Sequence, residues 1–190
     1  MNRTAFLIFI LAVIFLGLFS VYIFRNGHYP VALAHGEWIS ARRFNREHAV
    51  YGKVFEEYAR ANRLVISTSD AFRREVGRNG FDRLIEATLI KRAIQDLPGR
   101  AAEETIRKLV CDGRASPANA KLREIIGGVS EKEFEKVLLQ PRAEREFLKN
   151  YLEDQGEDFE VWLLEAKRRA RVAIFKDPYE WDGERVVLVP

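Results

Sequence analysis

The sequence predicts a mainly α-helical protein: an N-terminal transmembrane helix, then a helical domain whose small β-sheet is formed by segments near its two ends. Three observations lead to this fold class. Residues 5–24 are apolar and carry no charge. Between residues 40 and 171, apolar side chains recur at helical spacing. Short runs of small, β-branched and aromatic residues stand on either side of that helical region, at residues 31–39 and 172–189.

Residues 5–24 match the ~20 apolar residues that a helix needs to cross a ~30 Å hydrocarbon layer. The very short segment before them contains Arg3, which favours a cytoplasmic N-terminus and an extracytoplasmic domain in the cell envelope. A cleaved signal peptide is the alternative, because Ala32-Leu33-Ala34 fits a cleavage site, but the apolar run exceeds the usual ~7–15 residues. The predicted division is a cytoplasmic tail at 1–4, a transmembrane anchor at 5–24, a link at 25–30 and one domain at 31–190.

The domain is predicted to open with a β-hairpin that leads into a helix. Residues 31–34 read as a strand, His35-Gly36 as the turn, and the chain then resumes an extended pattern up to Ile39. Ser40 is a helix N-cap residue, so a helix should run from there to about residue 62.

This first helix carries five ring side chains on one stripe, at spacings of four and three residues. Packing in the core is the favoured interpretation of the stripe, and a polypeptide-binding surface is the alternative. His48 is read as a core or edge histidine because no partner acid or cysteine accompanies it. The stripe consists of Phe44, His48, Tyr51, Phe55 and Tyr58. The candidate polypeptide-contact residues are Tyr51, Phe55, Tyr58 and Trp162.

The middle of the chain is predicted to form a series of further helices. Gly77 and Asn79-Gly80 are expected to break the chain between a short helix at 70–76 and a longer one at 81–97. The longer helix is apolar on more than one face, which predicts that it lies at the centre of the core. The remaining helices are expected at 101–111, 117–126, 131–154 with an interruption or a restart at Pro141, and 158–171.

The C-terminal segment is predicted to return to extended structure. Residues 172–175 read as a strand, and residues 179–189 as a hairpin around Asp182-Gly183. Either 172–175 or 186–189 should pair with the strand at 31–34, because an isolated hairpin is marginal in water.

Composition excludes several classes of function. The net charge is +3, from 31 basic and 28 acidic residues that are interspersed, so the chain offers no concentrated field for nucleic acid. Cys111 is the single cysteine; it cannot form an intramolecular disulfide and is predicted to be a buried or half-buried small apolar residue. The sequence has no phosphate loop, nucleophile elbow or spaced metal ligands. We therefore expect no enzymatic activity, no metal and no cofactor.

Six residues of the opening segment resemble the N-terminal chaperone domain of SurA-type proteins, the non-catalytic part of the SurA, PpiD and PrsA-like prolyl isomerases. Members of this family usually carry Asn where this chain has His35. The resemblance continues in the segments LIEATLIKRAI at 84–94 and FEVWLLEAKRRARVAIF at 159–175. The matching opening residues are Val31, Gly36, Glu37, Ile39, Ser40 and Phe44.

The resemblance implies a chaperone-like domain closed by pairing of its two ends, without the separate parvulin domain that performs isomerisation. We expect a membrane-anchored extracytoplasmic protein, in a bacterial envelope or periplasm, that binds unfolded or secreted polypeptides without catalysis. A structural subunit that binds one dedicated partner of an envelope or secretion complex is the alternative. The basic residues near 167–171 lie at the C-terminal end of a predicted helix, where the helix dipole favours positive charge, so they need no ligand. The alternative is that they contact anionic lipid headgroups.

Overall fold

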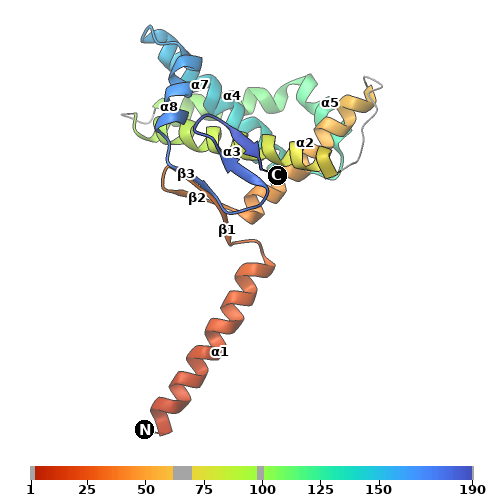
Figure 1. The fold of residues 1–190 in the computed structure, drawn as a ribbon. Coiled ribbons are helices and arrows are strands. Elements are labelled where there is room, and N and C mark those ends of the chain that lie inside the picture. The colour runs from red at the N-terminus through yellow and green to blue at the C-terminus, as the bar shows by residue number, and fades with distance from the viewer. Residues whose placement is uncertain (1–2, 62–69, 98–100, 190) are drawn as a thin grey trace.

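The computed structural model describes residues 3–61, 70–97 and 101–189, and it confirms a mainly helical fold with small antiparallel sheets (Figure 1). The helices are α1 (Arg3–Arg25), α2 (Ala41–Ala61), α3 (Asp70–Gln95), α4 (Ala101–Ala115), α5 (Pro117–Ile126), α6 (Glu131–Phe134), the π-helix η1 (Glu135–Leu139), α7 (Gln140–Asp154) and α8 (Phe159–Arg169). The strands are β1 (Pro30–Ala34), β2 (Glu37–Ser40), β3 (Val172–Ile174), β4 (Tyr179–Trp181) and β5 (Val186–Leu188).

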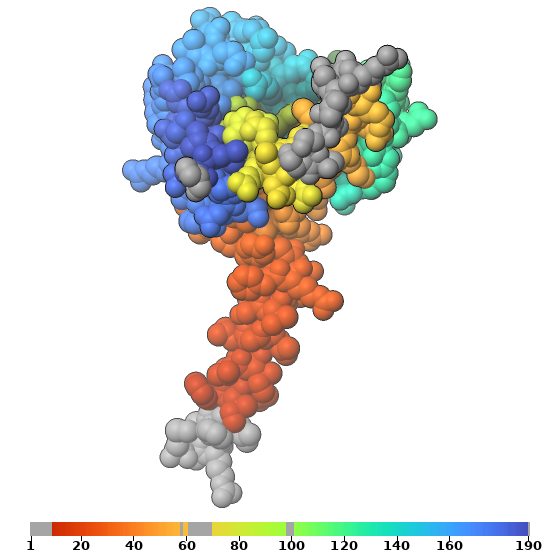
Figure 2. Space-filling view, turned by 45° about the vertical axis from the view of Figure 1, so that its right-hand side comes forward, coloured from red at the N-terminus to blue at the C-terminus, as the bar shows by residue number. Residues whose placement is uncertain are grey.

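Helix α1 extends away from the rest of the molecule as a single stalk (Figures 1 and 2). From Phe9 onward its large apolar side chains are exposed on every side of the helix. In the part of the chain whose side chains the structure describes, which includes α1 only from Phe9, no helix reaches the length and hydropathy of a membrane span. The helix predicted for residues 5–24 is therefore present, and its insertion in a membrane stays a prediction.

The three-stranded sheet joins the two ends of the domain in the order β2-β1-β3. Leu33 of β1 lies opposite Trp38 of β2 on one side and Ala173 of β3 on the other, and both pairings are antiparallel. His35 (φ 49°) and Gly36 (φ 86°) form the β1–β2 turn with the positive φ angles expected of a tight hairpin. The predicted pairing of the chain ends is thus confirmed with β3, while β5 pairs only with β4 among the described strands.

Helix α3 occupies the centre of the core, as predicted, but it is not divided. Gly77 and Gly80 were expected to end or break it, and both lie inside one continuous helix of 26 residues. A Cβ at Gly77 would lie 2.1 Å from the Tyr179 hydroxyl, and one at Gly80 would lie 3.8 Å from the Phe44 ring. Gly77 therefore serves the close packing of β4 against α3, which outweighs its poor helix propensity, whereas a Cβ at Gly80 would make only an ordinary van der Waals contact.

Pro141 lies in the first turn of α7, where a new α-helix begins after η1 and the missing N–H is harmless, so the expected restart at this residue is confirmed. Two other sequence expectations are wrong in detail. Helix α4 continues through Gly113 to Ala115, where the glycine leaves room for Leu139. Cys111 is exposed on α4, not buried, because the buried face of that helix consists of Ala102, Ile106 and Val110.

Candidate functional site

A cleft opens between helices α2, α3 and α5 and the η1–α7 segment. We call it the helical cleft. Its volume is about 490 Å³, which lies within the range of about 300–1,000 Å³ that is usual for ligand pockets. The apolar wall is formed by Val54, Ala87, Ile90, Leu122, Val137, Leu138, Leu139 and Pro141. Polar and charged residues at the same cleft are Glu47, Tyr51, Arg83, Glu86, Asn119, Arg142 and Arg145.

The π-helix η1 supplies one wall of the helical cleft. Its three successive apolar residues Val137, Leu138 and Leu139 all reach the cleft, with the first and last of them buried. A π-helix widens the turn and weakens the regular pattern of backbone hydrogen bonds, and such segments are frequent at functional sites. Here one of its carbonyls, that of Val137, accepts a hydrogen bond from the Tyr51 hydroxyl at 3.3 Å.

Tyr51 is held between α3 and η1. The Arg83 guanidinium lies over the Tyr51 ring, with its Cζ 3.8 Å from the ring centroid. Burial raises the pKa of the Tyr51 hydroxyl to about 12, so the residue is a neutral hydrogen-bond donor at physiological pH. Tyr51 and Arg83 together thus present to the cleft an aromatic ring with a guanidinium stacked on it.

Glu47 is a buried carboxyl group in the same cleft, one helical turn before Tyr51. It is 7% exposed and lies 3.7 Å from the Arg43 guanidinium. Burial raises its pKa to about 7, although Arg43, Arg83 and Arg46 oppose the shift. Glu47 therefore changes charge near neutral pH, inside an apolar cleft.

A second cavity, of about 530 Å³, adjoins the helical cleft, and the two share Glu47, Ala87, Val137 and Pro141 as lining residues. Its charged lining is mixed but mainly basic. Burial raises the pKa of the Glu144 carboxyl, which accepts a hydrogen bond from Gln140 at 2.8 Å. The basic lining residues are Arg43, Arg46, Lys91, Lys132 and Lys136. A charged segment of a ligand in the helical cleft could thus continue into this neighbouring space.

Ion pairs tie α3, α7 and α8 together beside the helical cleft. Glu86 of α3 binds the Arg145 guanidinium at 3.1 Å and the Lys167 ammonium at 2.5 Å. Arg145 also contacts Glu160 at 2.9 Å. Because Glu86 and Arg145 line the cleft, this network fixes the position of its charged rim.

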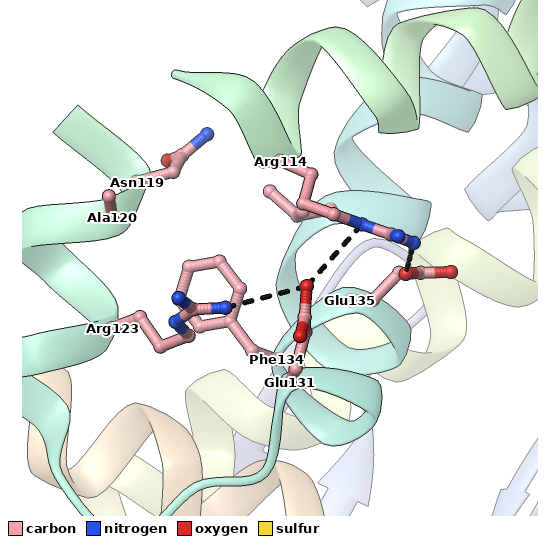
Figure 3. A pocket seen from close by; sticks show the side chains of 8 residues that line it. Arg114, Asn119, Ala120, Arg123, Glu131, Phe134 and Glu135 are labelled. Atoms are coloured by element: carbon pink, nitrogen blue, oxygen red, sulfur yellow. Dashed lines mark hydrogen bonds and ion pairs between the residues drawn. The ribbon is translucent and has the colours of Figure 1, made fainter. Parts of the chain in front are cut away.

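A further ion-pair cluster lies between α4, α5 and α6, and Figure 3 shows its members. Arg114 bridges Glu131, at 3.8 Å, and Glu135, while Arg123 contacts Glu131 at 3.5 Å. The cavity that remains there is about 10 Å³, which is room for about one water molecule. The cluster therefore joins helices and is not a ligand site.

The three candidate contact residues whose side chains the structure describes do not lie at one site. Tyr51 lines the helical cleft. Phe55 is 45% exposed, with its ring 5.2 Å from that of Phe72, and it does not line the cleft. Trp162 is half-buried on α8 with its ring 5.9 Å from Phe159, and the side chain of Tyr58 lies outside the described residues.

The predicted aromatic stripe of α2 is therefore only partly buried. The buried face of α2 includes Phe44, Glu47, Val50 and Ala59, and Phe55 lies off that face. His48 is half-buried, with Nε2 3.4 Å from the Arg73 carbonyl, as expected of an edge histidine.

The sequence analysis missed Glu47, Arg83 and Arg145, which are charged residues of the helical cleft. Glu47 offered a signal, because it follows Phe44 by three residues and precedes Tyr51 by four, and so shares their helical face. Arg83 and Arg145 offered none, since both helices expose other arginines. Among the described residues, no group of His, Cys, Asp or Glu side chains is arranged to hold a metal ion.

Compared with protein-family models, curated proteins and solved structures, the chain has no significant match in any of the three.

Proposed function

We propose that this protein is a membrane-anchored, extracytoplasmic, chaperone-like domain that binds unfolded or secreted polypeptide segments without catalysing a reaction on them. The observation that carries the proposal is the helical cleft, whose apolar wall is bordered by charges of both signs. Apolar side chains of an extended or partly folded segment would bind the wall. The arginines and glutamates would bind the segment's carbonyl and amide groups or its charged side chains.

The size and chemistry of the cleft favour a polypeptide over a small rigid ligand. Together with the adjoining basic cavity, it offers two neighbouring spaces of about 490 and about 530 Å³. Its walls combine aliphatic side chains with the Tyr51 ring, over which the Arg83 guanidinium lies. Such a lining does not require one ligand shape.

The membrane anchor in this proposal is α1. The apolar run at residues 5–24 carries no charge, and the described part of the helix exposes large apolar side chains around its whole circumference. In water such a surface would be costly, because burial of apolar surface contributes roughly 25 cal/mol per Å². A bilayer removes that cost.

The resemblance to SurA-type chaperone domains is part of the proposal and has support in the fold. The hairpin β1–β2 leads directly into α2, and the Arg43 N–H donates to the Ser40 hydroxyl at 3.3 Å. The segment at 84–94 belongs to the central helix α3, and β3 closes the sheet on β1. These features are consistent with the family's expected plan of a helical domain closed by its ends.

Photo-crosslinking from the helical cleft tests this function. A crosslinking amino acid replaces Leu122, which faces the cleft from α5, or Ile125, which is 43% exposed on the same helix outside the cleft. With the full chain in native membranes, we expect crosslinks to several unrelated polypeptides from position 122 and few from position 125.

Other outcomes would change the proposal. Crosslinks from position 122 to one protein alone would favour the structural subunit of an envelope or secretion complex. Equal crosslinking from both positions, or none from position 122, would mean that the helical cleft does not bind polypeptide.

A further inference from the structure

The sheet β2-β1-β3 has one face packed on the helices and one face without cover. Ala32, Ala34 and Ile39 point to the helices and are fully buried. The opposite side chains form what we call the outer sheet face: Leu33, Trp38, Ala173 and Phe175. None of the four is charged, and Trp38 and Phe175 are 62% and 57% exposed.

The two exposed aromatic residues belong to one surface. The ring centroids of Trp38 and Phe175 lie 6.1 Å apart, although the two residues come from opposite ends of the domain. Leu33 connects them, because it lies opposite Trp38 on β2 and opposite Ala173 on β3. Single exposed apolar residues are common, but a contiguous exposed patch marks an interaction surface.

The outer sheet face lies on the side of the domain from which α1 departs. Figure 1 shows the sheet between the helices and α1. The short link that follows α1 is hydrogen-bonded to the start of α2. The Arg42 N–H donates to the Gly27 carbonyl at 2.7 Å, and the Ala41 N–H donates to the Tyr29 carbonyl at 2.9 Å. The Phe24 and Tyr29 rings are 5.4 Å apart. The position of α1 relative to the sheet is thus fixed by backbone hydrogen bonds and not by a free linker.

We propose that the outer sheet face rests on the interfacial layer of the bilayer that holds α1, with Trp38 and Phe175 inserted among the lipid headgroups. This inference rests on the proposed anchor. Trp and other aromatic side chains are favoured at the level of the headgroups, where one end of the ring is apolar and the other wet. A lipid surface is the partner that continuity with α1 indicates, because any other occupant would have to fit between the sheet and the membrane.

Basic residues around this face complete the site for lipid phosphates. Arg25 is the last residue of α1, and Arg42 lies in the first turn of α2, where its N–H donates to the Gly27 carbonyl. Arg171 lies beside the β1–β2 turn, because its carbonyl accepts a hydrogen bond from the His35 N–H at 2.9 Å. Arg42 and Arg171 are exposed, and none of the three arginines forms an ion pair with a described residue. Basic residues near an anionic lipid surface attract it, so these arginines favour contact of the outer sheet face with the headgroups.

Quenching of tryptophan fluorescence by brominated lipids tests the proposal with the full chain. The protein is placed in vesicles of phosphatidylcholine and phosphatidylglycerol whose acyl chains are brominated either near the ester or near the methyl end. We expect strong quenching, greater with bromine near the ester, and loss of most of it in Trp38→Phe. Trp162→Phe is the matched control and should keep the quenching, because Trp162 lies on α8 against Phe159.

Flotation of the same vesicles separates the two proposals. If the chain floats with the vesicles but Trp38→Phe is quenched as strongly as the unmodified protein, the outer sheet face does not touch lipid and this inference is wrong, while the anchor stands. If Trp38 is instead shielded by a second copy or a bound peptide, its quenching is also absent and the inference is equally overturned. Failure to float would disprove the anchor itself.

Discussion

At the scale of single residues, the packing of Tyr179 against α3 depends on the absence of a side chain at Gly77. The Tyr179 ring that approaches it is itself enclosed, with ring centroids 5.1 Å from Phe81 and 6.4 Å from Phe44. Tyr179 therefore has little freedom to move aside for a methyl group.

Gly77→Ala should destabilise the domain, by about 1–3 kcal/mol, because overpacking forces side chains from their preferred positions. Gly52→Ala is the matched control, since a Cβ there meets nothing within 4 Å on helix α2. We expect the control to be neutral or more stable by up to about 1 kcal/mol, owing to the better helix propensity of alanine. Urea unfolding followed by circular dichroism measures both. A Gly77→Ala protein as stable as the control would contradict the packing argument.

Glu47 should make stability depend on pH. Burial raises the pKa of Glu47 from its usual value of 4.5 to about 7. Between these two pH values, the folded chain therefore keeps a proton on Glu47 that the unfolded chain has lost. The stabilisation is complete below about pH 4.5 and is lost as pH rises to about 7, with a total of up to about 3 kcal/mol.

Glu47→Gln should remove this part of the pH dependence, because glutamine does not titrate. The measurement is the free energy of unfolding across the same pH range, and the difference between the two proteins isolates Glu47 from other buried carboxyls such as Glu144. Glu56→Gln, at an exposed position of α2, is the control and should retain the slope of the unmodified protein. A Glu47→Gln protein with an unchanged slope would contradict the burial of this carboxyl.

At the scale of elements, the β4–β5 hairpin is fastened to α3 by side chains and not by sheet pairing. The Val186 N–H donates to the Asp82 carboxylate at 2.7 Å, and Val186 is fully buried in the main core cluster. Burial raises the pKa of Asp82, and the bond from Val186 opposes that rise. Arg78 of the same helix donates a second hydrogen bond to the Val186 carbonyl at 3.4 Å. These two side chains of α3 hold β5, and the hairpin in turn places Tyr179 against Gly77.

Asp82→Ala should cost about 1–3 kcal/mol of folding free energy, because it leaves the buried Val186 N–H without an acceptor. Asp82→Asn retains an acceptor oxygen and should lose less. Asp70→Ala, on the same helix, removes an 81% exposed carboxylate that lies 3.9 Å from Arg73, and such exposed pairs contribute at most about 1 kcal/mol. Thermal melts compare the three; similar losses for Asp82→Ala and Asp70→Ala would mean that the hairpin is held by burial alone.

At the scale of the whole molecule, the stalk and the helical cleft are arranged around the sheet. Helix α1 and the outer sheet face lie on one side, and the helices that form the cleft pack on the other face of the sheet and beyond it (Figure 1). In the orientation that we propose, the domain sits close to the membrane with its cleft-forming helices directed away from the lipid. A translocated segment would meet the cleft soon after leaving the membrane.

Cys111 gives a direct test of this topology because it is exposed and is the single cysteine of the chain. In intact cells or spheroplasts, a membrane-impermeant thiol reagent should label it without lysis if the domain is extracytoplasmic. Cys111→Ala provides the control for background labelling. Labelling that requires lysis would place the domain in the cytoplasm and overturn the proposed orientation.

The sequence by itself determined the local elements whose signals lie within a few residues. The His35-Gly36 turn and the cap of α2 at Ser40 were both predicted from the sequence. Each depends on backbone geometry that neighbouring side chains fix. The pairing of the chain ends could also be expected, although the choice of β3 over β5 could not, since both segments are apolar and β-branched.

Only the tertiary structure decided what depends on contacts between distant segments. Gly77 has the local signal of a helix breaker, and only the approach of Tyr179, from a strand about a hundred residues later in the chain, explains why a glycine lies there inside a helix. Of the three candidate contact residues whose side chains the structure describes, Tyr51 lines the helical cleft while Phe55 and Trp162 do not, because that cleft is formed by helices far apart in the chain and by a π-helix that no local pattern predicts. A helical stripe shows which side chains share a face, but burial, a shifted pKa and a cleft arise from the elements opposite that face.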